Sequence, residues 1–161
     1  MLKPYICVAC EKVIIDQPTE PHPPGTTGPP SLINLFSKMI VEIMPQTDVP
    51  ANAVGPKEWV IFSMWDVEAG DENKHLFLGT SILYPDGTQF GEARKVPIPI
   101  HLGQRSQMAI RINGFPLGQA GFYTVRTWIE EKEVIVTGPI EFKIELQIIM
   151  KDNETSQAQI Q

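Results

Sequence analysis

Two cysteines separated by two residues, Cys7 and Cys10, form the pattern in this chain with the plainest chemical meaning. A Cys-x-x-Cys pair can supply half of a tetrahedral zinc site or a redox couple. A structural zinc site needs four ligands, however, and the sequence contains no second pair. The stretch 5–15 is rich in Ile and Val and indicates a strand, in which residues three apart point to opposite faces. We therefore interpret the cysteines as two separate buried side chains.

Histidine is the next residue type that could support catalysis or bind a metal. His22, His75 and His101 are the only histidines, and they lie far apart without metal-ligand spacing. The sequence contains no serine elbow, His-Glu-x-x-His pattern or glycine-rich phosphate loop. We interpret His75 and His101 as structural or surface residues rather than catalytic bases.

Carboxylates gather around one turn, and they are Asp66, Glu68, Asp71 and Glu72. Carboxylate oxygens bind hard cations, but a calcium loop needs ligands that alternate around a defined turn, and this cluster lacks that regularity. We interpret residues 66–72 as a solvated acidic loop. The run 130–133 is interpreted in the same way, as the charged tip of a hairpin that keeps the turn soluble.

Charge and composition exclude several classes of function. The formal net charge of -6 disfavours nucleic-acid binding, which depends on Lys and Arg that neutralise phosphates. No apolar stretch approaches the roughly 18–20 residues that span a membrane. Residues 1–5 lack the apolar core and cleavage site of a signal peptide, so we expect a cytoplasmic protein.

The element with the clearest pattern covers residues 121–136. Apolar and polar residues alternate along 121–129, a charged turn follows at 130–133, and a β-branched run begins at Val134. This pattern is typical of two antiparallel strands joined in a hairpin. Tyr123, two residues after Gly121, resembles the tyrosine corner of immunoglobulin-like sandwiches, in which the tyrosine bonds back to the preceding turn.

The remaining segments predict an all-β chain. Fifteen prolines disfavour helices and favour a loop-rich β protein. Further strands are expected at 5–15, 58–67, 75–84, 88–90, 106–112 and 140–149, with 96–100 as an edge strand or extended connection. Residues 58–67 are apolar on both faces and should form a central, buried strand. The total of seven or eight strands predicts an immunoglobulin-like antiparallel β-sandwich.

Residues 31–44 are ambiguous. Apolar residues recur there at helical spacing, and Ser31 could cap a helix. The same residues also place an alternating apolar set on one face of a strand, so periodicity does not decide between the two. The all-β neighbourhood favours a strand.

The domain organisation follows from these elements. We expect one sandwich domain over residues 1–149, with a proline-rich, mobile loop insert at 16–30. Residues 150–161 are polar and should form a disordered tail. The predicted core consists of Val8, Ile61, Trp65, Leu78, Ile82, Ile110, Tyr123, Val125 and Phe142. At least two of the three tryptophans, Trp59, Trp65 and Trp128, should fill the core rather than form an exposed binding platform.

The motifs Phe115-Pro116-Leu117 and Gly121-Phe122-Tyr123, with the turn Tyr84-Pro85-Asp86-Gly87, support a resemblance to a known family. They resemble those of a bacterial family of small β-sandwich proteins known only as a domain of unknown function. The resemblance covers about residues 5–146 and implies a compact immunoglobulin-like sandwich. It implies no catalytic residue, and the insert at 17–30 departs from the family pattern.

Two functional hypotheses follow. The first is a non-enzymatic interaction or structural module that binds another protein, or a second copy of itself, through an edge strand or loops. Its expected contact regions are 17–30, 45–56 and 96–103. The alternative is a small ligand-binding or metal-binding domain, or an enzyme, with a site assembled from distant loops, for which His75, His101 and the 66–72 cluster are the candidates. We assign no catalytic residue, metal ligand or cofactor.

Overall fold

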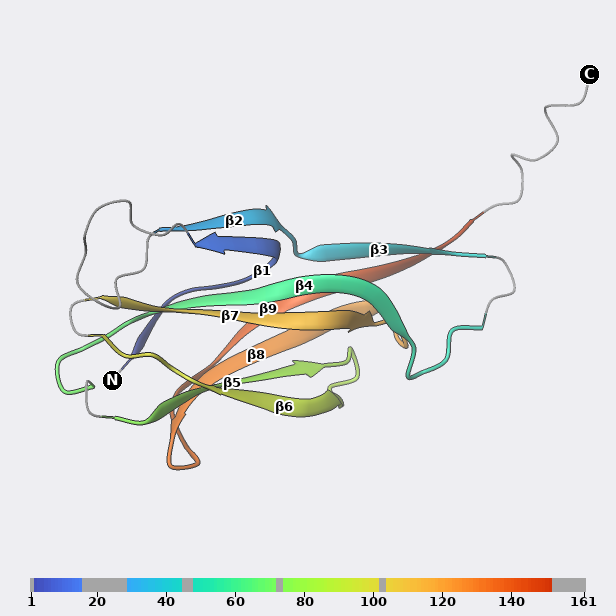
Figure 1. The fold of residues 1–161 in the computed structure, drawn as a ribbon. Coiled ribbons are helices and arrows are strands. Elements are labelled where there is room, and N and C mark those ends of the chain that lie inside the picture. The colour runs from blue at the N-terminus through green and yellow to red at the C-terminus, as the bar shows by residue number, and fades with distance from the viewer. Residues whose placement is uncertain (1, 16–28, 45–47, 72–73, 102–103, 152–161) are drawn as a thin grey trace, which may run out of the picture.

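The computed structural model describes residues 2–15, 29–44, 48–71, 74–101 and 104–151, and these form two β-sheets (Figure 1). The four-stranded sheet has the order β2-β1-β4-β7 and contains β1 (Lys3–Ile15), β2 (Pro30–Leu35), β4 (Val54–Asp66) and β7 (Arg105–Pro116). The five-stranded sheet has the order β3-β9-β8-β5-β6 and contains β3 (Lys38–Ile43), β5 (Leu76–Leu83), β6 (Gln89–Pro97), β8 (Gly121–Glu131) and β9 (Val134–Met150). The predicted all-β class is confirmed.

The described residues contain nine strands rather than seven or eight. One reason is that the ambiguous stretch 31–44 forms two strands, β2 and β3, in different sheets. Phe36 N–H donates to the carbonyl of Ala9 in one sheet, and the carbonyl of Ser37 accepts from Glu145 N–H in the other. The chain therefore crosses between the sheets at Phe36 and Ser37. The strand interpretation of this stretch is confirmed.

The second sheet is not wholly antiparallel. After the crossing, β3 runs parallel to β9, with Lys38 opposite Glu145 and Ile43 opposite Met150. Figure 1 shows these two strands side by side, extending to the right of the molecule. All other strand pairs are antiparallel. The expectation of an antiparallel sandwich is therefore wrong for this one pair, because the chain enters the second sheet without reversing direction.

Strand β4 is central and buried, as its two apolar faces predict. Its odd-numbered side chains, including Trp59 and Trp65, face the second sheet, whereas Val60, Phe62 and Met64 face the opposite side with Cys10. This second apolar cluster lies on the side of β4 that faces away from the second sheet, so other residues must shield it from solvent. Strand β1 leaves β4 after Cys10 and pairs with β2, and Val13 and Leu32 from these two strands pack against the cluster.

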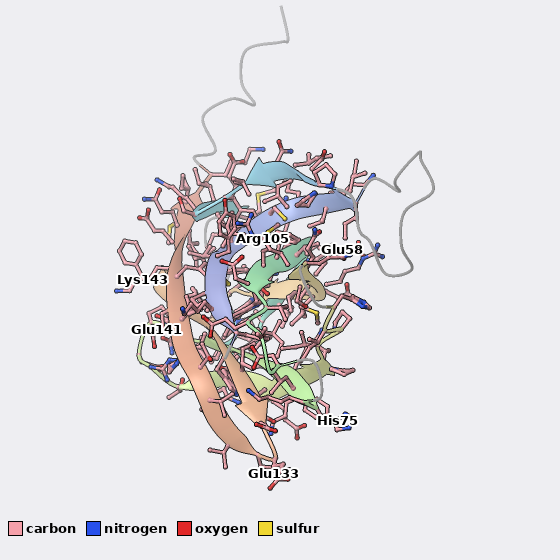
Figure 2. All side chains as sticks on the ribbon, turned by 90° about the vertical axis from the view of Figure 1, so that its left-hand side faces the viewer. Glu58, His75, Arg105, Glu133, Glu141 and Lys143 are labelled. Carbon is pink, nitrogen blue, oxygen red and sulfur yellow. The ribbon has the colours of Figure 1, made fainter. Side chains whose placement is uncertain are left out.

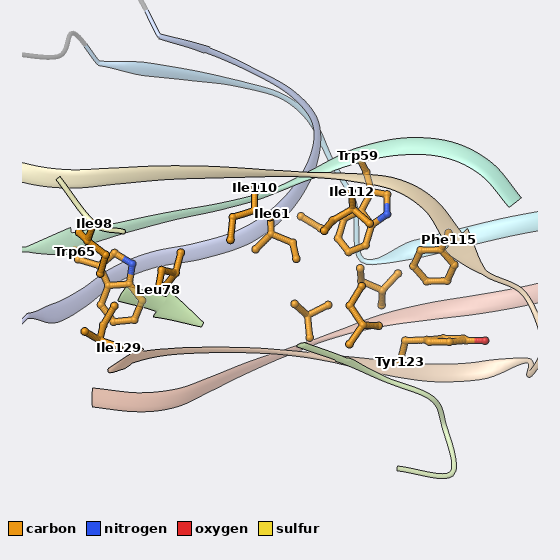
Figure 3. Packing of buried hydrophobic residues seen from close by; sticks show 14 of the residues in the cluster. Trp59, Ile61, Trp65, Leu78, Ile98, Ile110, Ile112, Phe115, Tyr123 and Ile129 are labelled. Carbon is orange, nitrogen blue, oxygen red and sulfur yellow. The ribbon is translucent and has the colours of Figure 1, made fainter. Parts of the chain in front are cut away.

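The main core lies between the two sheets (Figure 3). The predicted core residues Ile61, Trp65, Leu78, Ile82, Ile110, Tyr123 and Val125 are buried there, and Phe142 packs against them. Trp59 and Trp65 both fill this core, as expected for at least two tryptophans. Val8 is the exception, because it lies on the same face of β1 as Cys10 and packs against the outer cluster.

The predicted tyrosine bond closes one end of the core. Tyr123 O–H donates to the carbonyl of Gln119 at 2.7 Å, and its oxygen accepts from Gln119 N–H at 3.3 Å. The ring packs against those of Phe115 and Tyr84, at centroid distances of 5.0 and 5.6 Å. The hydroxyl therefore anchors the turn that precedes β8.

The predicted hairpin of β8 and β9 is also present. Lys132 and Glu133 turn the chain with positive φ angles of 49° and 66°, which is the geometry of a two-residue hairpin loop. Beyond the turn, β9 continues through Gly138 and Pro139 to Met150 as one strand, rather than restarting at Ile140.

Candidate functional site

The cysteines lie on opposite faces of β1, as predicted. The Sγ atom of Cys7 points between the sheets and lies 3.4 Å from Thr127 Oγ1. The thiol of Cys10 belongs to the outer cluster and is 3.8 Å from the carbonyl of Val60. Both thiols are free, and burial raises the pKa of each. A raised pKa keeps them protonated and poorly nucleophilic.

The candidate histidines are not brought into a common site. His75 and His101 are both exposed, and His22 lies outside the described residues. In Figure 2, His75 lies toward the same end of the molecule as Glu133 and away from Arg105 and Glu58. No group of three or more His, Cys, Asp or Glu side chains in the described ranges could hold a metal ion.

The acidic loop is not simply solvated, which corrects our interpretation of residues 66–72. Each described carboxylate forms an ion pair, Asp66 with Arg105, Glu68 with Lys3 and Asp71 with Lys74. Asp71 is fully buried. Burial is the largest influence and raises its pKa, but the hydrogen bonds from Lys74 and from Glu68 N–H and the nearby positive charge together outweigh it, and the pKa of Asp71 lies below its usual value. Glu72 lies outside the described residues.

The outer face of the five-stranded sheet carries the third tryptophan. The indole of Trp128 lies over Gly79, where a Cβ atom would come within 2.1 Å of the ring. Its Nε1–H donates to Glu130 at 3.2 Å, and Glu130 also pairs with Lys95 at 2.7 Å. The half-buried indole is therefore packed on its own sheet.

Glu130 is only 5% exposed, although we expected it at a solvated hairpin tip. It lies within β8, opposite Phe77 of β5, and its carboxylate is covered by the side chains of Trp128 and Lys95 that bond to it. By contrast, Glu133 is at the tip of the hairpin in Figure 2, and Glu141 and Lys143 are exposed on β9. The hydrogen bond from Lys95 holds the pKa of Glu130 below its usual value.

A cleft that sequence reasoning missed lies between β5, β6 and β7. Thr80 pairs with Arg94, but Ile82 pairs with Phe90, so β6 bulges outward between these two pairs. The resulting cleft has a volume of about 380 Å³ and extends to Asn113 of β7. Thr80 is 3% exposed, and its Oγ1 atom has no hydrogen-bond partner among the described residues. Gly91 lies in the bulge with a φ of 64°, and an isolated glycine within a strand is the sequence signal that could have marked it.

The edge of β3 is a second candidate site, and it is an open strand edge of the kind the sequence led us to expect. Within the part of the chain that the structure describes, β3 pairs only with β9. The carbonyl of Ser37 accepts from Glu145 N–H of β9 at 2.8 Å, and that of Ile43 accepts from Lys151 N–H, just after β9, at 2.9 Å. Because bonding groups alternate along a strand, the N–H and C=O groups of Lys38, Ile40 and Glu42 point away from β9.

A cavity and two exposed apolar side chains lie at the edge of β3. A cavity of about 540 Å³ runs beside β3 and is bordered by Gly55, Lys57 and Leu117. Ile40 is 54% exposed, and Met44 just beyond the strand is 64% exposed. An exposed apolar side chain in the middle of an open strand edge promotes aggregation, and it is therefore unusual unless another chain covers that edge.

The expected contact regions are only partly described. Residues 17–28 lie outside the described ranges, and so do 45–47 and 102–103. Gly55 and Pro56, from the second region, border the cavity beside β3. In the region 96–103, Ile98 is 7% exposed and packs in the main core, so this residue stabilises the fold rather than forming a contact surface.

Comparisons with known proteins identify no family model and no curated protein that matches this chain. No helix in the described ranges is long and apolar enough to cross a membrane.

Proposed function

We propose that this protein is a non-enzymatic interaction or structural module that uses the open edge of β3 to pair with an extended segment of another polypeptide. One observation carries the proposal: the backbone groups of Lys38, Ile40 and Glu42 point away from β9 along an exposed edge. An open edge of this kind accepts a further strand by backbone hydrogen bonding, while alternate side chains provide specificity.

An immunoglobulin-like arrangement of the two sheets is part of the proposal. The hydrogen bonds of Tyr123 to Gln119 support it, because a tyrosine near the start of such a strand bonds back to the preceding turn in those folds. Membership of the bacterial family of unknown function is proposed on the same residues, with Phe115 and Tyr84 packed around Tyr123. The two free thiols support a cytoplasmic location, where disulfides are rare.

Proline at Ile40 tests the proposed function. The N–H of Ile40 does not bond to β9, so Ile40→Pro removes a donor from the open edge while it leaves the β3–β9 ladder intact. Ile40→Thr is the matched control, because it keeps the N–H and a β-branched side chain. We expect tagged wild-type protein and the Thr variant to retain a partner or defined oligomer, as measured by affinity isolation and light scattering, and the Pro variant to lose it. Association unchanged in a folded Ile40→Pro variant would overturn the proposal.

A second candidate function is the binding of a small polar ligand in the cleft beside Thr80. The buried hydroxyl without a described partner favours it, because buried polar groups are nearly always hydrogen-bonded. A fragment screen by NMR tests this function. Ligands that shift the amide signals of Thr80 and Arg94 in the wild type, and not in Thr80→Val, would support it. No fragment shifting these signals would count against it.

A further inference from the structure

The edge of β3 is complementary to itself. We propose that β3 pairs antiparallel with β3 of a second copy of this chain, about a two-fold axis that passes between the two Ile40 residues. This inference rests on the proposed function and identifies the partner. The result is a continuous sheet in which the two five-stranded sheets join edge to edge.

The backbone geometry permits this pairing. The outward-facing N–H and C=O groups belong to the even-numbered residues Lys38, Ile40 and Glu42. In an antiparallel pair, directly opposed residues of a hydrogen-bonded pair exchange both of their bonds. With the axis at Ile40, every outward-facing residue opposes another outward-facing residue. Each backbone N–H and C=O group that points away from β9 then has a hydrogen-bonding partner in the second copy.

Charge selects the register. With the axis at Ile40, Lys38 of each copy lies opposite Glu42 of the other, and the two Ile40 side chains meet between these charged pairs. Opposite charges directly across a strand pair are stabilising, and like charges there are destabilising. Moving the axis by one residue places Glu42 opposite Ile40 or Phe36 and loses both ion pairs. The centred register is therefore the one that the edge itself favours.

The side chains on this face are available for the contact. Ile40 is 54% exposed, and Lys38 is 45% exposed. Lys38 lies 3.9 Å from Glu145 of β9, at the far limit of an ion pair, and its ammonium can approach a second carboxylate. On the other face of β3, Met39 and Val41 pack against the main core of their own copy. Pairing at this edge therefore covers Ile40 without uncovering the core.

Reciprocal charge changes test the inference. Lys38→Glu gives the edge two acidic residues and Glu42→Lys gives it two basic residues, so each variant replaces both ion pairs of the symmetric dimer by repulsions. We expect sedimentation equilibrium to show a reversible wild-type dimer whose dissociation constant is raised about ten- to hundredfold in either variant. Lys132→Glu changes the net charge by the same amount as Lys38→Glu, but it lies at the exposed tip of the β8–β9 hairpin, and we expect it to leave the dimer unchanged.

Mixing the two variants provides the decisive measurement. An acidic edge paired with a basic edge restores two ion pairs, so tagged Lys38→Glu should capture untagged Glu42→Lys more strongly than it captures untagged Lys38→Glu. The double variant carrying both changes should dimerise with itself like the wild type. Thermal melting of each variant confirms that it is folded.

The outcomes separate the two proposals. A monomeric wild type at all concentrations, or a mixture that associates no better than the single variants, would overturn the self-pairing in this register. If Ile40→Pro still abolished association with a different protein, the proposed function would stand. Association that persisted in folded Ile40→Pro would overturn both.

Discussion

The substitution Thr80→Val should stabilise this protein, although it removes a polar group from a central strand. Thr80 lies on β5 between Leu78 and Ile82, is 3% exposed, and has an Oγ1 atom without a described hydrogen-bond partner. Valine has nearly the same shape, so the packing around the site should change little.

The magnitude follows from the missing hydrogen bond. A buried hydroxyl without a partner costs about 1–3 kcal/mol in proteins. Because Thr80 borders a cleft, we take the lower part of this range and expect the free energy of unfolding to rise by about 1–2 kcal/mol. For a domain of this size, that corresponds to a rise in Tm of roughly 2–8 °C.

Thr127→Val is the matched control. Thr127 is directly opposite Thr80 on β8 and is equally buried, but its hydroxyl lies 3.4 Å from the thiol of Cys7. Removing this hydroxyl breaks a weak hydrogen bond, and we expect stability to fall by about 0.5 kcal/mol. Thr80→Val should therefore raise the free energy of unfolding and Thr127→Val should lower it, although the two threonines are neighbours and the substitution is the same.

Urea unfolding followed by tryptophan fluorescence measures both effects, because Trp59 and Trp65 are buried in the core. A higher midpoint with an unchanged m-value in Thr80→Val would support the reasoning. A lower midpoint would refute it, since it would mean that the Thr80 hydroxyl is hydrogen-bonded in solution.

Three further predictions concern other buried or paired groups. Tyr123→Phe should lower the free energy of unfolding by about 1–2 kcal/mol through loss of the bonds to Gln119, whereas Tyr84→Phe should change it by less than about 0.5 kcal/mol; equal effects in urea unfolding would contradict this. The hydrogen bond from Lys95 lowers the pKa of Glu130 from 4.5, so its contribution to stability is complete above pH 4.5 and is lost as the pH falls through the lower pKa of the folded state. Glu130→Gln should flatten this acid dependence of Tm, and an unaltered pH profile would show that the pair contributes nothing. Cys7 and Cys10 should resist iodoacetamide near neutral pH in the folded protein and react after unfolding, as detected by mass spectrometry; rapid labelling of both thiols in the folded state would contradict their placement.

Local periodicity in the sequence predicts much of the fold. The apolar residues on both faces of 58–67 predict a central strand, and β4 is buried on both faces. The separation of Cys7 and Cys10 predicts that they face opposite sides, because side chains alternate along a strand. The Gly121-x-Tyr123 pattern predicts the bond to the preceding turn, since all of its atoms lie within a few residues.

Other features depend on which distant strands become neighbours. Glu130 is buried because β5 and β6 bring Phe77 and Lys95 beside it. Glu68 and Asp66 are neutralised by Lys3 and Arg105, which belong to β1 and β7, the two strands that flank β4. The alternation of charged and apolar residues in one strand carries no information about these partners.

In both candidate sites, too, some features follow from local sequence and others from the pairing of distant strands. The all-β neighbourhood favours a strand over the ambiguous stretch 31–44, but only the crossing at Phe36 and Ser37 and the parallel pairing with β9 leave Lys38, Ile40 and Glu42 on an open edge. Gly91 is a local signal for the bulge in β6, but the cleft at Thr80 also needs Asn113 of β7 beside the bulge. By itself the sequence determined the β class and the faces of several strands, because these follow from short-range alternation. Only the tertiary structure decided which strands lie at the sheet edges, β3 among them, and which polar groups are buried, because strand pairing joins residues far apart in the chain.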